Sequence, residues 1–298
     1  MALGNVVLVA TDLSESADEA IKLGHEYAER AGGKLVVCHV VHEVLRSAPL
    51  FPQAIQADME AVIHAESHAA AAVEDRVKDL TGRPSNGFEV RIESGGADAS
   101  ILRVAEDVGA TLVVTGSRGL TGIARLLLGN VAERIVRYAH CPVLVARPHA
   151  RTKKILAATD LSELSQPGVA LAGQVAAEQR GALTVLHALD ILPSPALGFT
   201  VPFGGVPVIP PPELVEQMRT AADGVLVGMV ERLGIKAGRR VVEGDAATMV
   251  IRTAEELDAE LVVVATHGRT GLARAALGSV AEKIVRGVHC SVLVARSH

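Results

Sequence analysis

The sequence repeats itself along nearly its whole length, and this repeat limits the folds that the chain can adopt. NVVLVATDLSES at 5–16 returns as KILAATDLSEL at 154–164. AEDVGATLVVTGSRGLTGIARLLLGNVAERIVRYAHCPVLVAR at 105–147 returns as AEELDAELVVVATHGRTGLARAALGSVAEKIVRGVHCSVLVAR at 254–296. The chain therefore encodes the same structural unit twice.

Each copy is long enough to form a domain with a core of its own. The 298 residues are 49% hydrophobic, which suits two domains of about 150 residues each. The short polar segment RPHARTK at 147–153 lies between the copies and is a suitable linker. We therefore predict one domain at 1–149 and a second at 150–298.

Short apolar runs alternate with helical stretches about five times in each copy. NVVLVA, KLVVCHVV, TLVVT and PVLVA are continuously apolar and rich in Val, which is typical of strands buried on both faces of a parallel sheet. SADEAIKLGHEYAERAGG has apolar residues at helical spacing and ends at a glycine pair, as a helix does. The alternation predicts two α/β domains with right-handed crossovers.

Charge, composition and cysteine usage exclude several classes of protein. A net charge of -5 and 2% aromatic residues provide neither a basic surface nor stacking platforms for nucleic acid. No Lys or Arg precedes Lys22, and the first apolar run is too short for a signal segment or a membrane span. Cys38, Cys141 and Cys290 lack metal or disulfide spacing. We therefore expect a cytoplasmic protein with reduced thiols and no nucleic-acid or membrane partner.

The two copies differ most in a proline-rich segment of the second. ILPSPALGFTVPFGGVPVIPP and Pro212 lie between Asp190 and Glu213 and hold seven of the 13 prolines. So many prolines exclude a helix or a central strand here. The segment is either an exposed loop, a lid over the neighbouring strand ends, or an arm for a partner.

The stretch TGSRGLTGIARLLLGNV at 115–131 has two interpretations. Its glycines and the following helix start could present backbone amides to a phosphate. Alternatively, Asn130 stands three residues before Glu133, and Ser279 stands three residues before Glu282, a capping-box pattern that needs no ligand. The residues alone leave both interpretations open.

Asp12 and Asp160 also have two interpretations. Each directly follows the first strand of its copy, at the edge where open parallel sheets bind ligands. A carboxylate there could accept a hydrogen bond from a ribose hydroxyl, and strand-end backbone groups could pair with adenine. The sequence TDLS equally favours a turn that leads into a helix.

A family resemblance adds to these observations. The spacing Gly, two residues, Gly, nine residues, Gly and then Ser or Thr resembles the nucleotide-binding motif of the universal stress protein family. The flanking ATDLS and CPVLVAR match as well, and the resemblance covers both copies. It implies a doubly wound α/β fold: two tandem five-stranded parallel sheets of order 3-2-1-4-5, with helices on both faces. It also implies ATP, alone or with Mg, held between strands one and four.

The resemblance carries the family's nucleotide contacts onto matching positions of both copies. In the first copy these are Ala10, Asp12, Val40, Gly116, Gly119, Gly129, Asn130 and Val131. In the second copy they are Ala158, Asp160, Ala188, Ala265, Gly268, Gly278, Ser279 and Val280.

Each copy departs from the family motif at one position. Asn130 replaces the usual Ser or Thr, but an amide can still donate to a phosphate, so we expect weaker binding rather than none. Ala265 replaces the first glycine. Its cost is about 1 kcal/mol if the position needs a positive φ, and otherwise depends on how the ligand lies. We expect both copies to bind.

The resemblance implies an ATP-binding module for stress response or signalling, with an unidentified protein partner. It also implies that PVLVA and SVLVA join the halves into an internal pseudo-dimer, and a homodimer of the whole chain is plausible. The sequence lacks GxxxxGKS and GxSxG, so we predict no catalytic residues and at most weak ATP hydrolysis. The alternatives are a nucleotide-free interaction scaffold and a slow ATPase.

The histidines are assigned no function at this point. His64 and His68 have the spacing of a metal-binding pair on a helix, but without an obvious third ligand a solvated helix face is favoured. His39 and His187 recur at matching positions, as do His140 and His289, and duplication alone can explain this recurrence. We predict no metal site.

Overall fold

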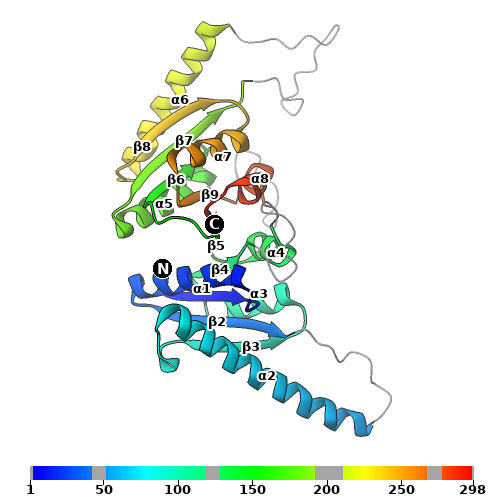
Figure 1. Ribbon diagram of the computed structural model, residues 1–298. Helices are drawn as coiled ribbons and strands as arrows, with labels where there is room; N and C mark the ends of the chain where they lie inside the picture. The colour runs from blue at the N-terminus through cyan, green and yellow to red at the C-terminus, as the bar shows by residue number, and fades with distance from the viewer. Residues whose placement is uncertain (1–2, 42–51, 118–127, 192–210, 267–276, 297–298) are drawn as a thin grey trace, which may run out of the picture. The chain divides into compact units, whose positions relative to one another are not determined.

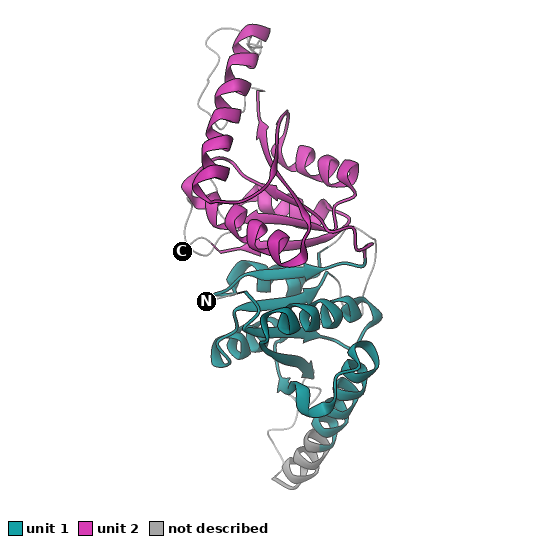
Figure 2. Ribbon diagram, turned by 90° about the vertical axis from the view of Figure 1, so that its left-hand side faces the viewer, with its two compact units in different colours: residues 1–148 teal, residues 149–298 magenta. Residues whose placement is uncertain are grey.

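The Val-rich runs form parallel β-strands, and an α-helix connects each strand to the next within each copy. The computed structural model describes residues 3–41, 52–117, 128–191, 211–266 and 277–296. The chain divides into two compact units, Met1–Pro148 and His149–His298 (Figure 2). These bounds differ by one residue from the domains expected at 1–149 and 150–298, and the boundary between independently folding domains stays a prediction.

The first unit contains one parallel sheet and the helices that cover it (Figure 1). Its elements are β1 (Val6–Thr11), α1 (Glu15–Ala31), β2 (Lys34–Val41), α2 (Pro52–Thr81), a 3-10 turn (Ser85–Gly87), β3 (Glu89–Ser94), α3 (Ala97–Asp107), β4 (Leu112–Gly116), α4 (Asn130–Tyr138) and β5 (Val143–Ala146). The strands lie in the order β3-β2-β1-β4-β5, and all neighbouring pairs are parallel.

The second unit repeats this architecture. Its elements are β6 (Lys154–Ala158), a 3-10 turn (Glu163–Ser165), α5 (Gln166–Gln179), β7 (Ala182–Leu189), α6 (Pro212–Arg232), β8 (Gly238–Glu243), α7 (Ala246–Leu257), β9 (Leu261–Ala265), α8 (Ser279–Gly287) and β10 (Ser291–Ala295). The strands lie in the order β8-β7-β6-β9-β10, all parallel. The predicted α/β class and the strand order 3-2-1-4-5 are confirmed in both units.

Both faces of each sheet are covered. Val7, Leu8 and Val9 point alternately to opposite faces of the first sheet, and each has 0% exposure. Leu156 and Ala157 of β6 are equally buried. A strand that is buried at consecutive positions requires helices on both sides of the sheet, which explains the continuous apolar runs in the sequence.

The predicted helix end at the glycine pair is confirmed. α1 ends before Gly32, which has φ 59° and whose N–H donates to the carbonyl of Glu29 at 3.0 Å. Glycine adopts this left-handed conformation without the steric cost that a Cβ brings.

The structure describes the proline-rich segment only at its two ends. Residues 192–210 lie outside the described residues, so its role as loop, lid or arm stays untested. Pro212 is the first residue of α6. Proline suits this position because the N–H group of the first helical residue has no partner within the helix. Its assignment to a non-helical segment was wrong. Among the described residues, no helix combines the length and the apolar composition that crossing a membrane requires.

Candidate functional site

The strand order creates one distinctive edge in each sheet. Because all five strands are parallel, their carboxyl ends lie together, and we call this the carboxyl edge. β1 lies between β2 and β4, with Ala10 opposite Cys38 on one side and Thr115 on the other. From β1 the chain first adds β2 and β3 on one side, and then crosses over to add β4 and β5 on the other side. Open α/β sheets bind ligands at the carboxyl edge where the strand order reverses in this way.

An acidic turn follows β1 at the carboxyl edge. Asp12 Oδ1 accepts hydrogen bonds from the backbone N and the Oγ of Ser14, at 3.1 and 2.5 Å. Thr11 Oγ1 accepts from the N of Leu13 at 3.1 Å. Leu13 has φ 63°, a left-handed conformation that costs a residue with a Cβ about 1–2 kcal/mol. The turn interpretation of TDLS therefore describes the local structure.

The second unit builds the same turn after β6. Asp160 Oδ1 accepts from the N and Oγ of Ser162, at 3.0 and 2.6 Å, and Leu161 has φ 66°. Thr159 Oγ1 accepts from the N of Leu161 at 3.0 Å. A left-handed leucine at the same place in both units is backbone strain of the kind that persists at functional sites.

A histidine from the second strand of each unit supports this turn. Nδ1 of His39 lies 2.9 Å from the carbonyl oxygen of Thr11, and Nδ1 of His187 lies 2.9 Å from that of Thr159. A carbonyl can only accept, so Nδ1 carries the proton in both. Sequence reasoning assigned these histidines no role, although their recurrence at one position in both copies was the available signal.

Beyond β4 and β9 the chain returns to the strand end before a helix begins. The N of Gly129 donates to the carbonyl of Ser117 at 2.9 Å, and the N of Gly278 donates to that of Thr266 at 2.9 Å. α4 and α8 therefore begin at the carboxyl edge. The motif glycines Gly119 and Gly268 lie outside the described residues.

The capping-box prediction for these two helices was wrong. The N-cap residues are Gly129 and Gly278, with no side-chain capping bond, and Asn130 and Ser279 are the first residues inside their helices. A Cβ at Gly278 would lie 3.3 Å from the carbonyl oxygen of Thr266, so the close return to the strand favours glycine at the N-cap. The side chains of Asn130 and Ser279 are exposed.

These helix starts present groups suited to a phosphorylated ligand. The first N–H groups of an α-helix have no partner within the helix and carry its positive dipole end. No side-chain cap uses them in α4 or α8. Val131 and Val280, the next residues, are 37% and 41% exposed although they are apolar. Amide donors, a polar side chain and an apolar surface thus stand together at each carboxyl edge.

The remaining predicted residues lie on the same edges. Val40 is near the end of β2 and pairs with Glu93, while Ala188 is near the end of β7 and pairs with Val242. Ala158 is the last residue of β6. These positions can present backbone groups beside the turns of Asp12 and Asp160.

Ala265 causes no backbone strain. Ala265 and its counterpart Gly116 are the last residues of β9 and β4, and neither has a positive φ. A Cβ built on Gly168 of α5 would lie 3.5 Å from the Cβ of Ala265. The methyl group of Ala265 therefore faces the helix α5.

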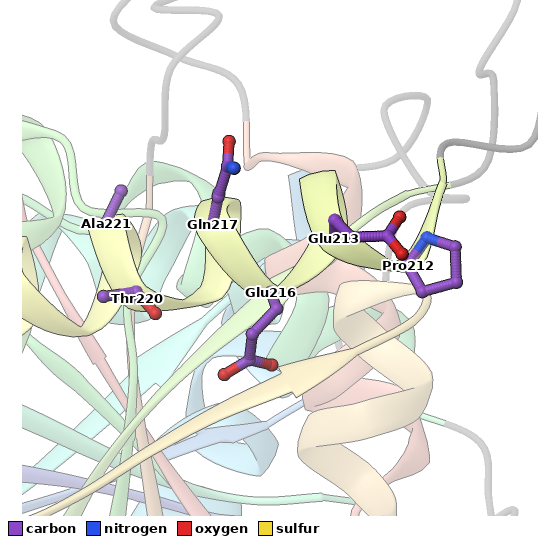
Figure 3. Close-up of a pocket in the computed structure, with 6 residues that line it drawn as sticks. All are labelled: Pro212, Glu213, Glu216, Gln217, Thr220 and Ala221. Atoms are coloured by element: carbon purple, nitrogen blue, oxygen red, sulfur yellow. The ribbon is translucent and has the colours of Figure 1, made fainter.

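A surface groove of about 750 Å³ lies elsewhere, along the start of α6 (Figure 3). Among the described residues, its lining comes from that one helix: Pro212, Glu213, Glu216, Gln217, Thr220 and Ala221. None of the predicted site residues that the structure describes lines this groove, and we assign it no role in ligand binding.

Comparisons of the sequence and of the structure with known proteins all indicate the same family. The sequence profile described as "Universal stress protein family" matches residues 5–147 and 151–296. Universal stress proteins of Mycolicibacterium smegmatis and Mycobacterium tuberculosis are each 27% identical, over 97% of this chain and 96% of their own length. A universal stress protein structure from Archaeoglobus fulgidus matches with TM-score 0.70 and 18% identity, covering 99% of both chains, which shows the shared fold.

Proposed function

The chain belongs to the universal stress protein family, with two domains in tandem, and we propose that each domain binds ATP at its carboxyl edge. The observation that supports this most is the pair of helix starts at α4 and α8. Both have glycine N-caps and amides without a side-chain cap, beside a strained acidic turn.

Each group at the edge has a proposed role. Asp12 and Asp160 accept hydrogen bonds from ribose hydroxyls. Their Oδ1 atoms already accept bonds within the turns, and an ionised carboxylate offers about four acceptor positions in all. The backbone near Val40 and Ala188 pairs with adenine. These roles follow the matched motif and the strand ends described above.

The phosphates are proposed to lie at the helix starts. The first amides of α4 and α8 donate to phosphate oxygens, and the exposed side chains of Asn130 and Ser279 add a further donor each. Gly119 and Gly268 complete this cradle in the proposal. Mg²⁺ enters with the phosphates, because it binds phosphate oxygens and retains water more readily than it binds protein cages.

The bound nucleotide is proposed to regulate partner choice in a stress response rather than to be consumed quickly. The sequence has no GxxxxGKS, so it lacks the phosphate-bridging lysine and the metal-binding hydroxyl of that motif. The three cysteines are buried and form no disulfide, which supports a reducing compartment such as the cytoplasm. Pairing of the two halves and a homodimer stay predictions.

Conservative changes at the acidic turns test this proposal. In Asp12→Asn and Asp160→Asn, the amide oxygen can still accept from Ser14 or Ser162, so the turn is expected to survive. We expect Mg-ATP to raise the melting temperature of the wild type, because a ligand that binds only the native state stabilises it. The rise in melting temperature should be much smaller in a variant that carries both Asp12→Asn and Asp160→Asn.

The matched control is Asp75→Asn, a carboxylate on α2 whose side chain is 76% exposed. It should melt and respond to Mg-ATP like the wild type. If Mg-ATP shifts the melting of the wild type and the double variant equally, the acidic turns are not part of the site. If it shifts neither, the nucleotide-free scaffold is the better account.

A further inference from the structure

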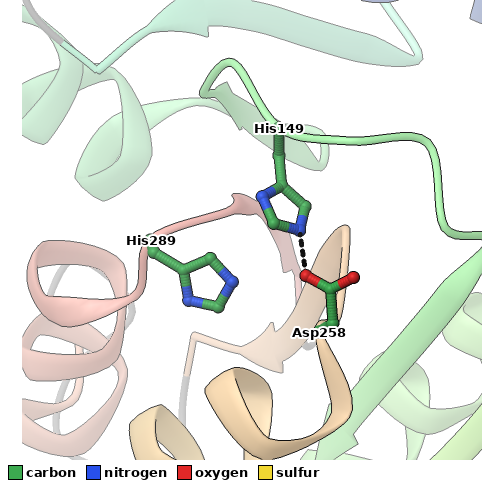
Figure 4. Close-up of side chains that lie close together, drawn as sticks. All are labelled: His149, Asp258 and His289. Atoms are coloured by element: carbon green, nitrogen blue, oxygen red, sulfur yellow. Dashed lines mark ion pairs between the residues drawn. The ribbon is translucent and has the colours of Figure 1, made fainter.

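A second group of polar side chains lies in the second unit, outside the proposed nucleotide site. It consists of His149, Asp258 and His289 (Figure 4). His149 precedes β6, Asp258 follows α7 and precedes β9, and His289 precedes β10. All three residues therefore lie at the edge where the strands begin, opposite the carboxyl edge. Five-residue strands separate the two edges by about 16 Å.

The three side chains point toward one another. Nε2 of His149 lies 3.3 Å from Oδ1 of Asp258, and the imidazole rings of His149 and His289 have centroids 4.8 Å apart (Figure 4). One nitrogen or oxygen atom from each residue lies within 4.8 Å of the other two. Two imidazoles and a carboxylate thus converge on one point.

Hydrogen bonds among the three side chains do not satisfy the buried ring of His149. Its side chain is only 17% exposed, and its Nε2 is buried with no hydrogen-bond partner among the described residues. The 3.3 Å approach to Asp258 lacks hydrogen-bond geometry. A buried polar atom without a partner is costly, and a ligand at this point would account for it.

The segment that carries His149 is fixed to the turn that carries Asp258. Thr152 Oγ1 donates to the carbonyl of Asp258 at 2.8 Å, and the N of Lys153 donates to Oε2 of Glu260 at 2.7 Å. These bonds hold the chain before β6 beside the connection between α7 and β9. The approach of His149 to Asp258 is therefore built into the fold.

Asp258 occupies a position that normally favours glycine. It is the C-cap of α7, with φ 51°, and its counterpart Gly109 in the first unit has φ 61°. A residue with a Cβ pays about 1–2 kcal/mol for this conformation. The second unit thus holds a carboxylate at this position at a cost that the first unit avoids with glycine.

We propose that His149, Asp258 and His289 bind a divalent transition-metal ion, for which Zn²⁺ is the best match. Zn²⁺ binds imidazole nitrogen and carboxylate oxygen at about 2.0–2.2 Å, which places tetrahedral ligand atoms about 3.3 Å apart. His149 and Asp258 already have this spacing. Magnesium and calcium fit less well, because they prefer oxygen ligands.

Three protein ligands leave a coordination position for water or another group. The ion would fasten the segment before β6 to the connections before β9 and β10. It would therefore stabilise the second unit and have no counterpart in the first, where Gly109 replaces the carboxylate.

Zinc titration of the full chain tests this proposal. After EDTA treatment and dialysis, we expect one tight Zn²⁺ per chain, measured without nucleotide because ATP itself chelates the ion. Asp258→Gly should weaken this binding at least tenfold. The variant restores the glycine of the first unit and relieves the positive φ, so its fold should be retained. His149→Gln should have the same effect on binding.

Two controls separate this site from adventitious binding by other histidines. His140→Gln removes the matching histidine of the first unit, and His64→Gln disrupts the exposed pair on α2; both should bind Zn²⁺ like the wild type. Zn²⁺ should also raise the melting temperature of the wild type but not of Asp258→Gly. No tight Zn²⁺ in the wild type, or equal affinity in Asp258→Gly and His149→Gln, would overturn the proposal.

Discussion

Gly168 of α5 packs against Ala265 at the end of β9, and the first unit carries the same two residue types exchanged. A Cβ on Gly168 would lie 3.2 Å from the backbone N of Ala265 and 3.5 Å from its Cβ. The corresponding positions of the first unit are Ala20 in α1 and Gly116 in β4. Ala265 therefore departs from the family motif together with a matching change in the helix. The alanine of the pair lies on the strand in the second unit and on the helix in the first.

This exchange predicts a coupled response to mutation. Gly168→Ala should lower the free energy of unfolding by about 1–3 kcal/mol, because the new methyl group meets both the backbone of β9 and the Cβ of Ala265. Adding Ala265→Gly recreates the pair of the first unit and should recover part of the loss. Urea denaturation of both single variants and the double variant measures the coupling, expected to be at least about 0.5 kcal/mol. Additive effects would show that the two residues do not share this space.

His187 should matter for stability although it touches no proposed ligand group. His187→Leu leaves the carbonyl of Thr159 without its buried donor, and we expect a loss of about 1–3 kcal/mol of unfolding free energy. His39→Leu should cost less, because His39 is only half-buried. Denaturant unfolding at neutral pH compares the two. An equal or larger effect of His39→Leu would contradict the assigned roles.

Asp245 should make the stability of the second unit depend on pH. It caps α7, where Oδ1 accepts from the N and Oγ1 of Thr248 at 2.9 and 2.7 Å. These hydrogen bonds lower the pKa of its carboxyl group below the usual value. The folded state therefore favours the ionised form, and the resulting stability is present above about pH 3.9 and is lost as the pH falls through the lower, folded pKa.

Asp245→Ala should cost about 0.5–2 kcal/mol at neutral pH, the usual value of an N-cap. Unfolding curves recorded from pH 7 to pH 2.5 should converge for the wild type and the variant at the acid end. A difference that stays constant over this range would exclude the ionised carboxylate as the source.

Cys38 should be chemically inert in the folded protein. Burial, with a smaller effect from the nearby charge of Glu93, raises the pKa of its thiol to about 12. The thiolate is the reactive form, so at pH 8 a thiol reagent should not modify Cys38 until the chain unfolds. Cys141 and Cys290 are buried as well. Rapid modification of any cysteine in native protein, read by mass spectrometry, would contradict this account.

The fold was predictable because both copies carry the same strong local signals. Continuous Val-rich runs predicted strands buried on both faces, and the glycine pair predicted the end of α1 at Gly32. The capping residues were predicted wrongly, because the pattern from Asn130 to Glu133 does not reveal that Gly129 returns to the carbonyl of Ser117. That contact forms only once β4 and α4 are packed.

The cluster of His149, Asp258 and His289 could not be predicted in the same way. Its members come from three connections that are far apart in sequence, and only the parallel sheet brings the starts of β6, β9 and β10 to one edge. The partnership of His187 with the carbonyl of Thr159 was hidden for a similar reason. The recurrence of a histidine in both copies marked its position but did not reveal which carbonyl group the ring contacts.

Adding a negative charge at each helix start tests the central claim, ATP binding at the carboxyl edges, most directly. Asn130→Asp and Ser279→Asp place a carboxylate at the first position of α4 and α8. There the carboxylate should repel a phosphate group. It should also stabilise the helix by about 0.3–1 kcal/mol, through its interaction with the positive end of the helix dipole. Ala97→Asp is the matched control, because it adds the same charge at the first position of α3, which also has a glycine N-cap.

The measurement is calorimetric titration of the wild type and these three variants with Mg-ATP. We predict two sites in the wild type, one site with at least tenfold weaker affinity in each of Asn130→Asp and Ser279→Asp, and unchanged binding in Ala97→Asp. Each variant should be as stable as the wild type or slightly more stable. Unchanged stoichiometry and affinity in both Asn130→Asp and Ser279→Asp would contradict the account.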